Sequence, residues 1–323
     1  MAQGKADQSK GWREHIVIYA ALAANIGIAI AKFIAAAISG SSSMLTEGFH
    51  SVVDSGNQVL LLYGEHRAVK PPDEAHPFGY GRELYFWSFV VAILIFAGGA
   101  GLSIFEGYQH IIDPVEISDP TLNYIVLAVA FAMEGTSWFI AMREFGNAKG
   151  RLGWWQAVRV SKDPSGFVVL FEDSAACAGL IVAAIGQWAT HHFEDARIDG
   201  AASIVIGLIL GGVALLLARE AKGLLIGERA DLDVIENIRE VVGAHEAVSG
   251  VNHVRTIHTS PDEIFVAVSA DFEDEVRMGD AETMIEEIED SLRAAVPQLT
   301  SIYIRPEKRE NAALSPYKMP KGT

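Results

Sequence analysis

The sequence predicts an α-helical membrane protein with six transmembrane helices, followed by a small cytoplasmic α+β domain of order α-β-β-α-β. Half of the 323 residues are hydrophobic, which is too many for an ordinary soluble protein, yet the formal net charge is −16. Residues 228–310 hold 20 Asp and Glu against 8 Lys and Arg, and contain no long apolar run. We therefore expect an apolar membrane part and a separate acidic soluble part.

Six apolar stretches of roughly 20 residues are each long enough for a helix to cross a bilayer. The second and fifth stretches are the least apolar, as expected of helices that line a polar site inside a bundle. In chain order, the predicted spans lie near residues 15–38, 42–64, 84–110, 120–142, 165–190 and 198–220.

The basic residues predict the orientation, because short cytoplasmic loops are rich in Lys and Arg. Three basic residues precede the first span, three lie between the second and third spans, and five lie between the fourth and fifth. The loops near 39–41 and 111–119 have none, and 191–197 has only Arg197. Both termini should be cytoplasmic, and we expect an integral multi-pass protein of a bacterial inner or plasma membrane without a cleaved targeting segment.

The acidic part predicts two helices and three strands, with turn residues Ser260-Pro261-Asp262 between the first two strands. So small a domain leaves a sheet face or edge to cover, which favours a homodimer. Its negative charge argues against nucleic acid as a partner. The expected elements are Asp231–Ala244, Val248–Thr259, Glu263–Phe272, Gly279–Ala295 and Ser301–Arg305. They form a domain at 228–310 that follows a membrane domain at 13–222. Flexible tails are expected at 1–12 and 311–323.

Ionisable residues interrupt two of the predicted spans. His50 and Asp54 are four residues apart and therefore share one face of the second span, and Glu172 and Asp173 lie side by side in the fifth. A charged carboxylate at the bilayer centre costs about 2.5–3.5 kcal/mol on insertion scales, so such groups persist mainly where they face a polar cavity or bind an ion. Imidazole and carboxylates together suit a divalent metal. We predict a metal site at these four residues, with the metal as cargo.

The local motifs resemble the cation diffusion facilitator family of zinc and related metal transporters. The stretch Gly40–Asp54 is similar to that family's second-span signature, and His76–Glu83 resembles the loop that leads into its third span. The stretch 161–176 looks most like the subgroup that contains the ninth human zinc transporter. The resemblance covers residues 13–306 and implies a dimeric transporter with metal ligands on the second and fifth spans.

Two departures from the family's pattern concern its metal sites. The family usually carries His or Asp four residues before the fifth-span aspartate, where this chain has Val169. Glu172 is the candidate replacement, but neighbouring helical residues point about 100° apart, so Glu172 and Asp173 reach one ion only if the helix is rotated or distorted. Water is the alternative fourth ligand. In the soluble domain, strand positions that hold metal-binding histidines in many relatives are apolar or aromatic, so we expect no strong metal site there.

These observations together predict a secondary transporter, not an enzyme, that exports Zn²⁺ from the cytoplasm in exchange for protons and needs no organic cofactor. An oxygen-rich site also admits Mn²⁺, Fe²⁺ or Co²⁺, which remain alternative substrates. A membrane metalloenzyme would need a motif such as His-Glu-x-x-His, which does not occur in this sequence. A non-transporting metal sensor or scaffold is a further alternative, supported by the missing ligand at Val169.

Overall fold

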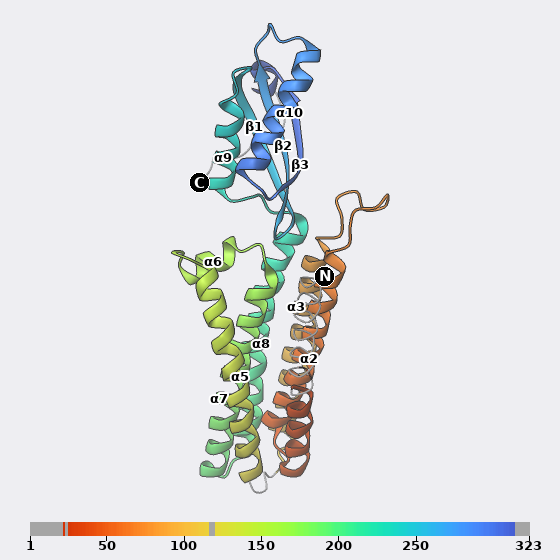
Figure 1. The fold of residues 1–323 in the computed structure, drawn as a ribbon. Helices are drawn as coiled ribbons and strands as arrows, with labels where there is room; N and C mark the ends of the chain where they lie inside the picture. The colour runs from red at the N-terminus through yellow and green to blue at the C-terminus, as the bar shows by residue number, and fades with distance from the viewer. Residues whose placement is uncertain (1–21, 23–24, 116–119, 314–323) are drawn as a thin grey trace, which may run out of the picture. The chain divides into compact units, whose positions relative to one another are not determined.

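Helices dominate the chain in the computed structural model, which describes residues 22, 25–115 and 120–313 (Figure 1). The first described helix, Asn25–Ser39, is followed by α2 (Ser42–Ala68). A continuous helical rod comes next, built from α3 (Glu83–Leu94), the π-helix η1 (Ile95–Gly101) and α4 (Leu102–Ile112). The remaining helices of this part are α5 (Thr121–Ala148), the short α6 (Trp154–Val160), α7 (Pro164–Phe193) and α8 (Arg197–Ile226).

Four helices among the described residues are long and apolar enough to cross a membrane: Glu83–Ile112, Thr121–Ala148, Gly166–Phe193 and Arg197–Ile226. The prediction of a helical membrane protein is therefore confirmed. The helix Asn25–Ser39 is apolar but short, and the beginning of the predicted span at 15–38 lies outside the described residues. Helix α2 has 27 residues but buries many polar side chains. The count of six spans stays a prediction.

Glycines allow the backbones of α4 and α8 to approach each other closely. A Cβ atom added at Gly107 would lie 2.5 Å from the carbonyl oxygen of Gly200, and one added at Gly200 would lie 2.8 Å from that of Gly107. Any side chain at either position would collide with backbone. Small residues are typical of helix contacts in membranes, where no hydrophobic force drives helices together.

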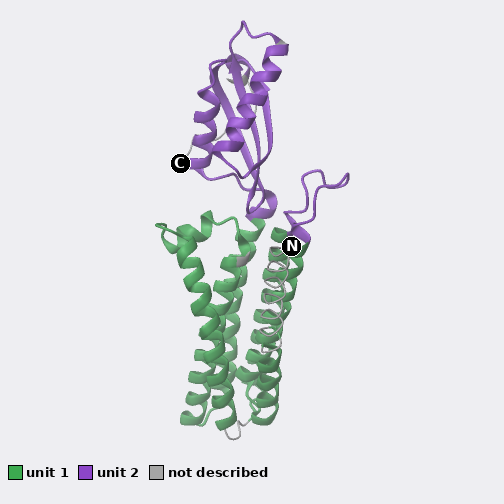
Figure 2. Cartoon of the chain, in the orientation of Figure 1, with its two compact units in different colours: residues 1–66, 84–222 green, residues 67–83, 223–323 purple. Residues whose placement is uncertain are grey.

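The chain divides into two compact units (Figure 2): residues 1–66 with 84–222, and residues 67–83 with 223–323. The second unit thus contains the loop between α2 and α3 together with the acidic domain. The ring of Phe78 in this loop meets that of Phe265 edge to face, with centroids 5.5 Å apart. Gly81 lies so close to the same strands that an added Cβ would be 2.5 Å from the carbonyl oxygen of Thr259.

The acidic domain contains a three-stranded mixed sheet of order β1-β2-β3, in which β1 and β2 are antiparallel and β2 and β3 are parallel. All five predicted elements are confirmed as α9 (Leu232–Gly243), β1 (Val248–Ser260), β2 (Glu263–Phe272), α10 (Met278–Ala295) and β3 (Leu299–Pro306), and the short α11 (Arg309–Ala313) follows them. Both longer helices pack on one sheet face, where Ile238, Val266 and Leu292 are fully buried. On β3, Tyr303 alternates with core residues and is 60% exposed, so it lies on the face opposite α9 and α10.

Candidate metal site

Three polar side chains form a stripe along one face of α2. His50, Asp54 and Asn57 follow one another at spacings of four and three residues, which places them on the same side of a helix. His50 is fully buried, and its Nδ1 atom lies 3.3 Å from Oδ1 of Asp54. Neither ring nitrogen of His50 nor this oxygen has a hydrogen-bond partner among the described residues. An unpaired buried polar atom costs about 1–3 kcal/mol, so these atoms fit a site that binds a cation.

Glu172 of α7 faces this stripe. Its side chain is 6% exposed, and its Oε1 atom accepts a hydrogen bond from Nδ2 of Asn57. Its carboxyl group also adjoins that of Asp54. Asp54 therefore lies next to both His50 and Glu172, two more of the four predicted residues, and the structure adds Asn57, which the sequence analysis did not single out. The signal was present, since Asn57 continues the helical spacing of His50 and Asp54.

Asp173 points in a different direction from its neighbour Glu172. It is half-buried and accepts a hydrogen bond of 2.7 Å from the hydroxyl of Ser137 on α5. Val169, one helical turn earlier, is half-buried as well. Among the residues that the structure describes, no three His, Cys, Asp or Glu side chains converge closely enough to hold a metal ion. Whether Asp173 and Glu172 bind one ion together stays a prediction.

A buried ion pair lies beside the site. Lys32 of the helix Asn25–Ser39 donates a hydrogen bond of 2.9 Å to Oε2 of Glu47 on α2 and one of 2.8 Å to the hydroxyl of Ser51. Lys32 and Glu47 are both 0% exposed. Glycine at 179 of α7 makes room for the pair, because a Cβ there would lie 2.5 Å from Oε1 of Glu47. Glu47 precedes His50 by three residues, so the ion pair stands on the metal-site side of α2.

The local charge favours a cation. Besides Asp54, Glu172 and Asp173, the half-buried Glu134 of α5 is close enough to repel all three carboxylates. Carboxylates confined in a medium of low dielectric repel one another strongly, and a divalent ion relieves that repulsion. The stripe therefore combines donor atoms that suit a metal ion with nearby carboxylates whose repulsion a cation would relieve.

A buried carboxylate fixes the beginning of α2, at the opposite end from Ala68. Asp199 of α8 accepts hydrogen bonds from the hydroxyl of Ser41 at 3.1 Å, from the backbone N–H of Ser43 at 3.0 Å and from the Ser43 hydroxyl. Negative charge at a helix N-terminus is stabilising because free N–H groups point toward it. Gln187 of α7 joins the cluster through a bond of 3.2 Å to Ser41. Helices α2, α7 and α8 are therefore tied together at this end.

Comparison with known proteins agrees with this architecture. Residues 18–226 match the family described as the cation efflux transmembrane domain. The chain belongs to the cation efflux family. Residues 230–309 match the companion cation efflux protein cytoplasmic domain. The resemblance noted in the sequence is thereby confirmed over most of the chain.

Several relatives have names that state a function. The chain is 32% identical over 248 residues to the Xenopus laevis proton-coupled zinc antiporter SLC30A9, mitochondrial, covering 76% of this chain and 44% of that protein. The human protein of the same name is 30% identical, and the match covers 80% of this chain and 47% of that one. The cation-efflux pump FieF of Escherichia coli is 25% identical, with 80% and 81% covered. The chain thus spans less than half the length of the two SLC30A9 relatives.

Proposed function

We propose that this protein is a secondary transporter, not an enzyme, that moves a divalent metal ion, Zn²⁺, out of the cytoplasm in exchange for protons. The observation that carries the proposal is the buried stripe of His50 and Asp54, in which three polar atoms have no hydrogen-bond partner among the described residues and Asp54 adjoins Glu172 of α7. Membership of the cation efflux family supports it, as do the names of relatives that are proton-coupled zinc antiporters or a cation-efflux pump.

Proton exchange follows from the chemistry of the ligands. Metal binding needs His50 neutral and Asp54, Glu172 and Asp173 ionised, so protons and metal compete for the same atoms. A metal ion that leaves the site is replaced by protons, and protons that leave admit the next metal ion. Histidine suits this exchange because its ordinary pKa, near 6.5, is close to physiological pH.

We further propose that metal binding changes the arrangement of α7. In the structure, the Asn57 amide holds Glu172, while Ser137 holds Asp173 on another side of the helix. A modest rotation of α7 would break the Ser137 contact and turn Asp173 toward α2, completing a set of four ligands. Water is the alternative fourth ligand if Asp173 stays on Ser137.

The wider architecture is proposed on the same basis. In this proposal the helices Asn25–Ser39 and α2 join the four apolar helices as six spans. The Lys and Arg residues of the loops favour cytoplasmic termini. The membrane is a bacterial inner or plasma membrane, and two copies of the chain associate through the acidic domain. Zn²⁺ is the first choice of substrate because one imidazole with carboxylates suits it, whereas Mn²⁺, Fe²⁺ and Co²⁺ are the alternatives.

Transport into proteoliposomes tests the function. Vesicles with a pH dye inside should take up Zn²⁺ while protons leave, and each metal is offered separately. Asp54→Ala should abolish both signals, because it removes a carboxylate from the stripe. The matched control is Ser88→Ala on α3, which removes only a hydrogen bond of 2.8 Å to Leu84 of the same helix. Zinc binding by the wild-type protein without flux would instead favour a sensor or scaffold.

A further inference from the structure

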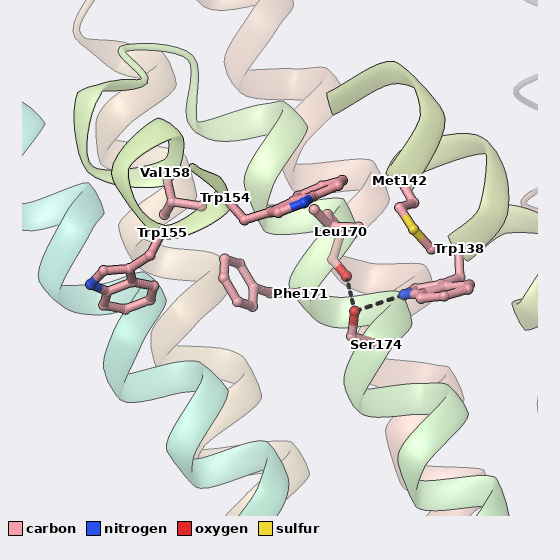
Figure 3. Close-up of a pocket in the computed structure, with 8 residues that line it drawn as sticks. All are labelled: Trp138, Met142, Trp154, Trp155, Val158, Leu170, Phe171 and Ser174. Atoms are coloured by element: carbon pink, nitrogen blue, oxygen red, sulfur yellow. Dashed lines mark hydrogen bonds between the residues drawn. The ribbon is translucent and has the colours of Figure 1, made fainter. Parts of the chain in front are cut away.

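An apolar cavity of about 350 Å³ lies where α5, α6 and α7 meet (Figure 3). Large aromatic side chains line it, with Trp138 from α5, Trp154 and Trp155 from α6, and Phe171 from α7. A second cavity of about 770 Å³ lies between α5 and α7 and shares Trp138 and Ser174 with the first. Together they form a groove along α5 and α7 that runs from the connection between these helices toward Ile181.

The groove offers little to a polar ligand. The hydroxyl of Ser174 accepts a hydrogen bond of 2.9 Å from Nε1 of Trp138 and donates one of 2.7 Å to the carbonyl oxygen of Leu170 (Figure 3). The hydroxyl of Thr136 likewise donates a hydrogen bond of 2.7 Å to the carbonyl oxygen of Ala132 in its own helix. Apart from the thiol of Cys177, the remaining walls are mainly aromatic and aliphatic, so the part of a ligand inside the groove must be apolar.

The rim of the groove is basic, although the chain as a whole carries a net charge of −16. Residues 143–162 hold five Lys and Arg residues against one acidic residue, Glu144. Lys149 lies 5.3 Å from the ring centre of Trp154, and Arg159 lies 5.2 Å from that of Trp155. Each of these two cavity-lining rings thus has a cation close to it. The exposed Arg151 lies between Lys149 and Arg159 in the sequence.

The groove has the depth of one bilayer leaflet. Helix α5 ends at Ala148 and the apolar span of α7 begins at Gly166, so the connection between them lies at the membrane surface, where Trp residues are enriched. From Phe171 to Ile181 a helix rises roughly 15 Å, which is half of the roughly 30 Å hydrocarbon core. An acyl chain that starts beside α6 would fit along this length.

We propose that this groove binds one anionic phospholipid of the surrounding bilayer, with an acyl chain between α5 and α7 and the phosphate beside Lys149, Arg151 and Arg159. A cationic rim above an apolar slot is complementary to an anionic amphiphile, and neither a neutral lipid nor an acidic soluble partner matches both parts. The lipid would pack on the helix that carries Glu172 and Asp173, on the side of Ser174.

Native mass spectrometry of the purified full-length protein tests the proposal. After delipidation, the protein is titrated with phosphatidylglycerol and with phosphatidylcholine of identical chains. We expect the first phosphatidylglycerol to bind at least fivefold more tightly. Gly135→Leu places a side chain in the groove at a position where an added Cβ meets nothing within 4 Å, and it should weaken this binding at least fivefold. The matched control, Gly212→Leu on α8, has equally open surroundings and should bind as the wild type.

A charge variant separates the headgroup from the chain. Arg151→Gln with Arg159→Gln, both exposed positions, should remove the preference for phosphatidylglycerol and leave phosphatidylcholine binding unchanged. This variant keeps the test decisive if Gly135→Leu fails to fold. Equal binding of the two lipids by the wild type would overturn the proposal. The proposal would also be overturned if Gly135→Leu bound lipid normally but changed from dimer to monomer. The groove would then be an interface between two copies of the chain.

Discussion

Adjacent residues in a helix point in different directions, so the two acidic residues of α7 contact different helices. Glu172 and Asp173 are consecutive, yet one contacts Asn57 of α2 and the other Ser137 of α5. The step of about 100° per residue accounts for this divergence. In the described arrangement Glu172 therefore adjoins Asp54, whereas Ser137 holds Asp173.

Glu172→Gln tests the role of this carboxylate. If it binds the metal directly, we expect zinc affinity by calorimetry to fall by at least tenfold, and Val169→His in the same protein should restore part of it, because position 169 is one turn from Asp173. Ser88→Ala again serves as the control. Unchanged affinity with slower proton-coupled turnover would make Glu172 a proton relay, and no change in either would make it structural.

The buried pair of Lys32 and Glu47 makes a prediction about stability. Lys32→Met leaves the Glu47 carboxylate buried without its cation, which typically costs about 3–5 kcal/mol. Adding Glu47→Leu removes the stranded charge, so the double variant should be more stable than the single one. Thermal unfolding in detergent measures both. A double variant that unfolds at or below the temperature of Lys32→Met would show that the pair is not coupled in this way.

At the scale of elements, patterns within a segment were predictable and contacts between segments were not. Hydropathy and alternation located the helices and the three strands, because local periodicity reports which face is buried. The spacing of His50 and Asp54 likewise predicted their common face. Which residues meet across two helices depends on how the helices are rotated about their axes. The contact of Asn57 with Glu172 and that of Lys32 with Glu47 therefore became known only from the structure.

The loop between α2 and α3 contains a small hydrogen-bonded structure of its own. The hydroxyl of Tyr80 donates a bond of 2.6 Å to Asp73 and holds the pKa of that carboxyl below its usual range, with a second bond of 2.7 Å from the backbone N–H of His76. The ordered loop thus favours the ionised form of Asp73. The order of the loop should persist at pH values above the ordinary Asp pKa, and it should be lost as the pH falls through the lowered pKa of Asp73.

Asp73→Asn should therefore loosen this loop at neutral pH. Hydrogen exchange followed by mass spectrometry should show faster exchange at residues 74–80 in the variant, and the wild type should approach the variant's rate only in acid. Glu74→Gln is the control. Glu74 is exposed like the adjacent Asp73, so this variant removes a neighbouring negative charge and keeps the Asp73 carboxylate. Equal exchange in wild type and Asp73→Asn would mean that the carboxylate does not order the loop.

At the scale of the whole molecule, the acidic domain carries most of the negative charge, and its two longer helices, α9 and α10, lie on one face of its sheet. On the opposite face, Tyr303 of β3 is 60% exposed, and its ring lies 5.4 Å from that of the half-buried Phe265, against which Phe78 packs. An exposed aromatic side chain beside other aromatic rings favours association with another protein surface. In the proposed homodimer, this surface would be a second copy of the chain.

Tyr303→Glu in the full-length protein tests this interface. A charge at the centre of an apolar contact between two copies should convert the dimer into a monomer, as measured by light scattering in detergent. Leu232→Glu is the matched control, since Leu232 is 66% exposed but belongs to α9, which lies on the opposite face of the sheet from Tyr303. Because no strong metal site is expected on these strands, the wild-type dimer should also survive a chelator. If it dissociates when metal is removed and re-forms with zinc, the domain holds a metal-dependent interface and the proposed association through Tyr303 is wrong.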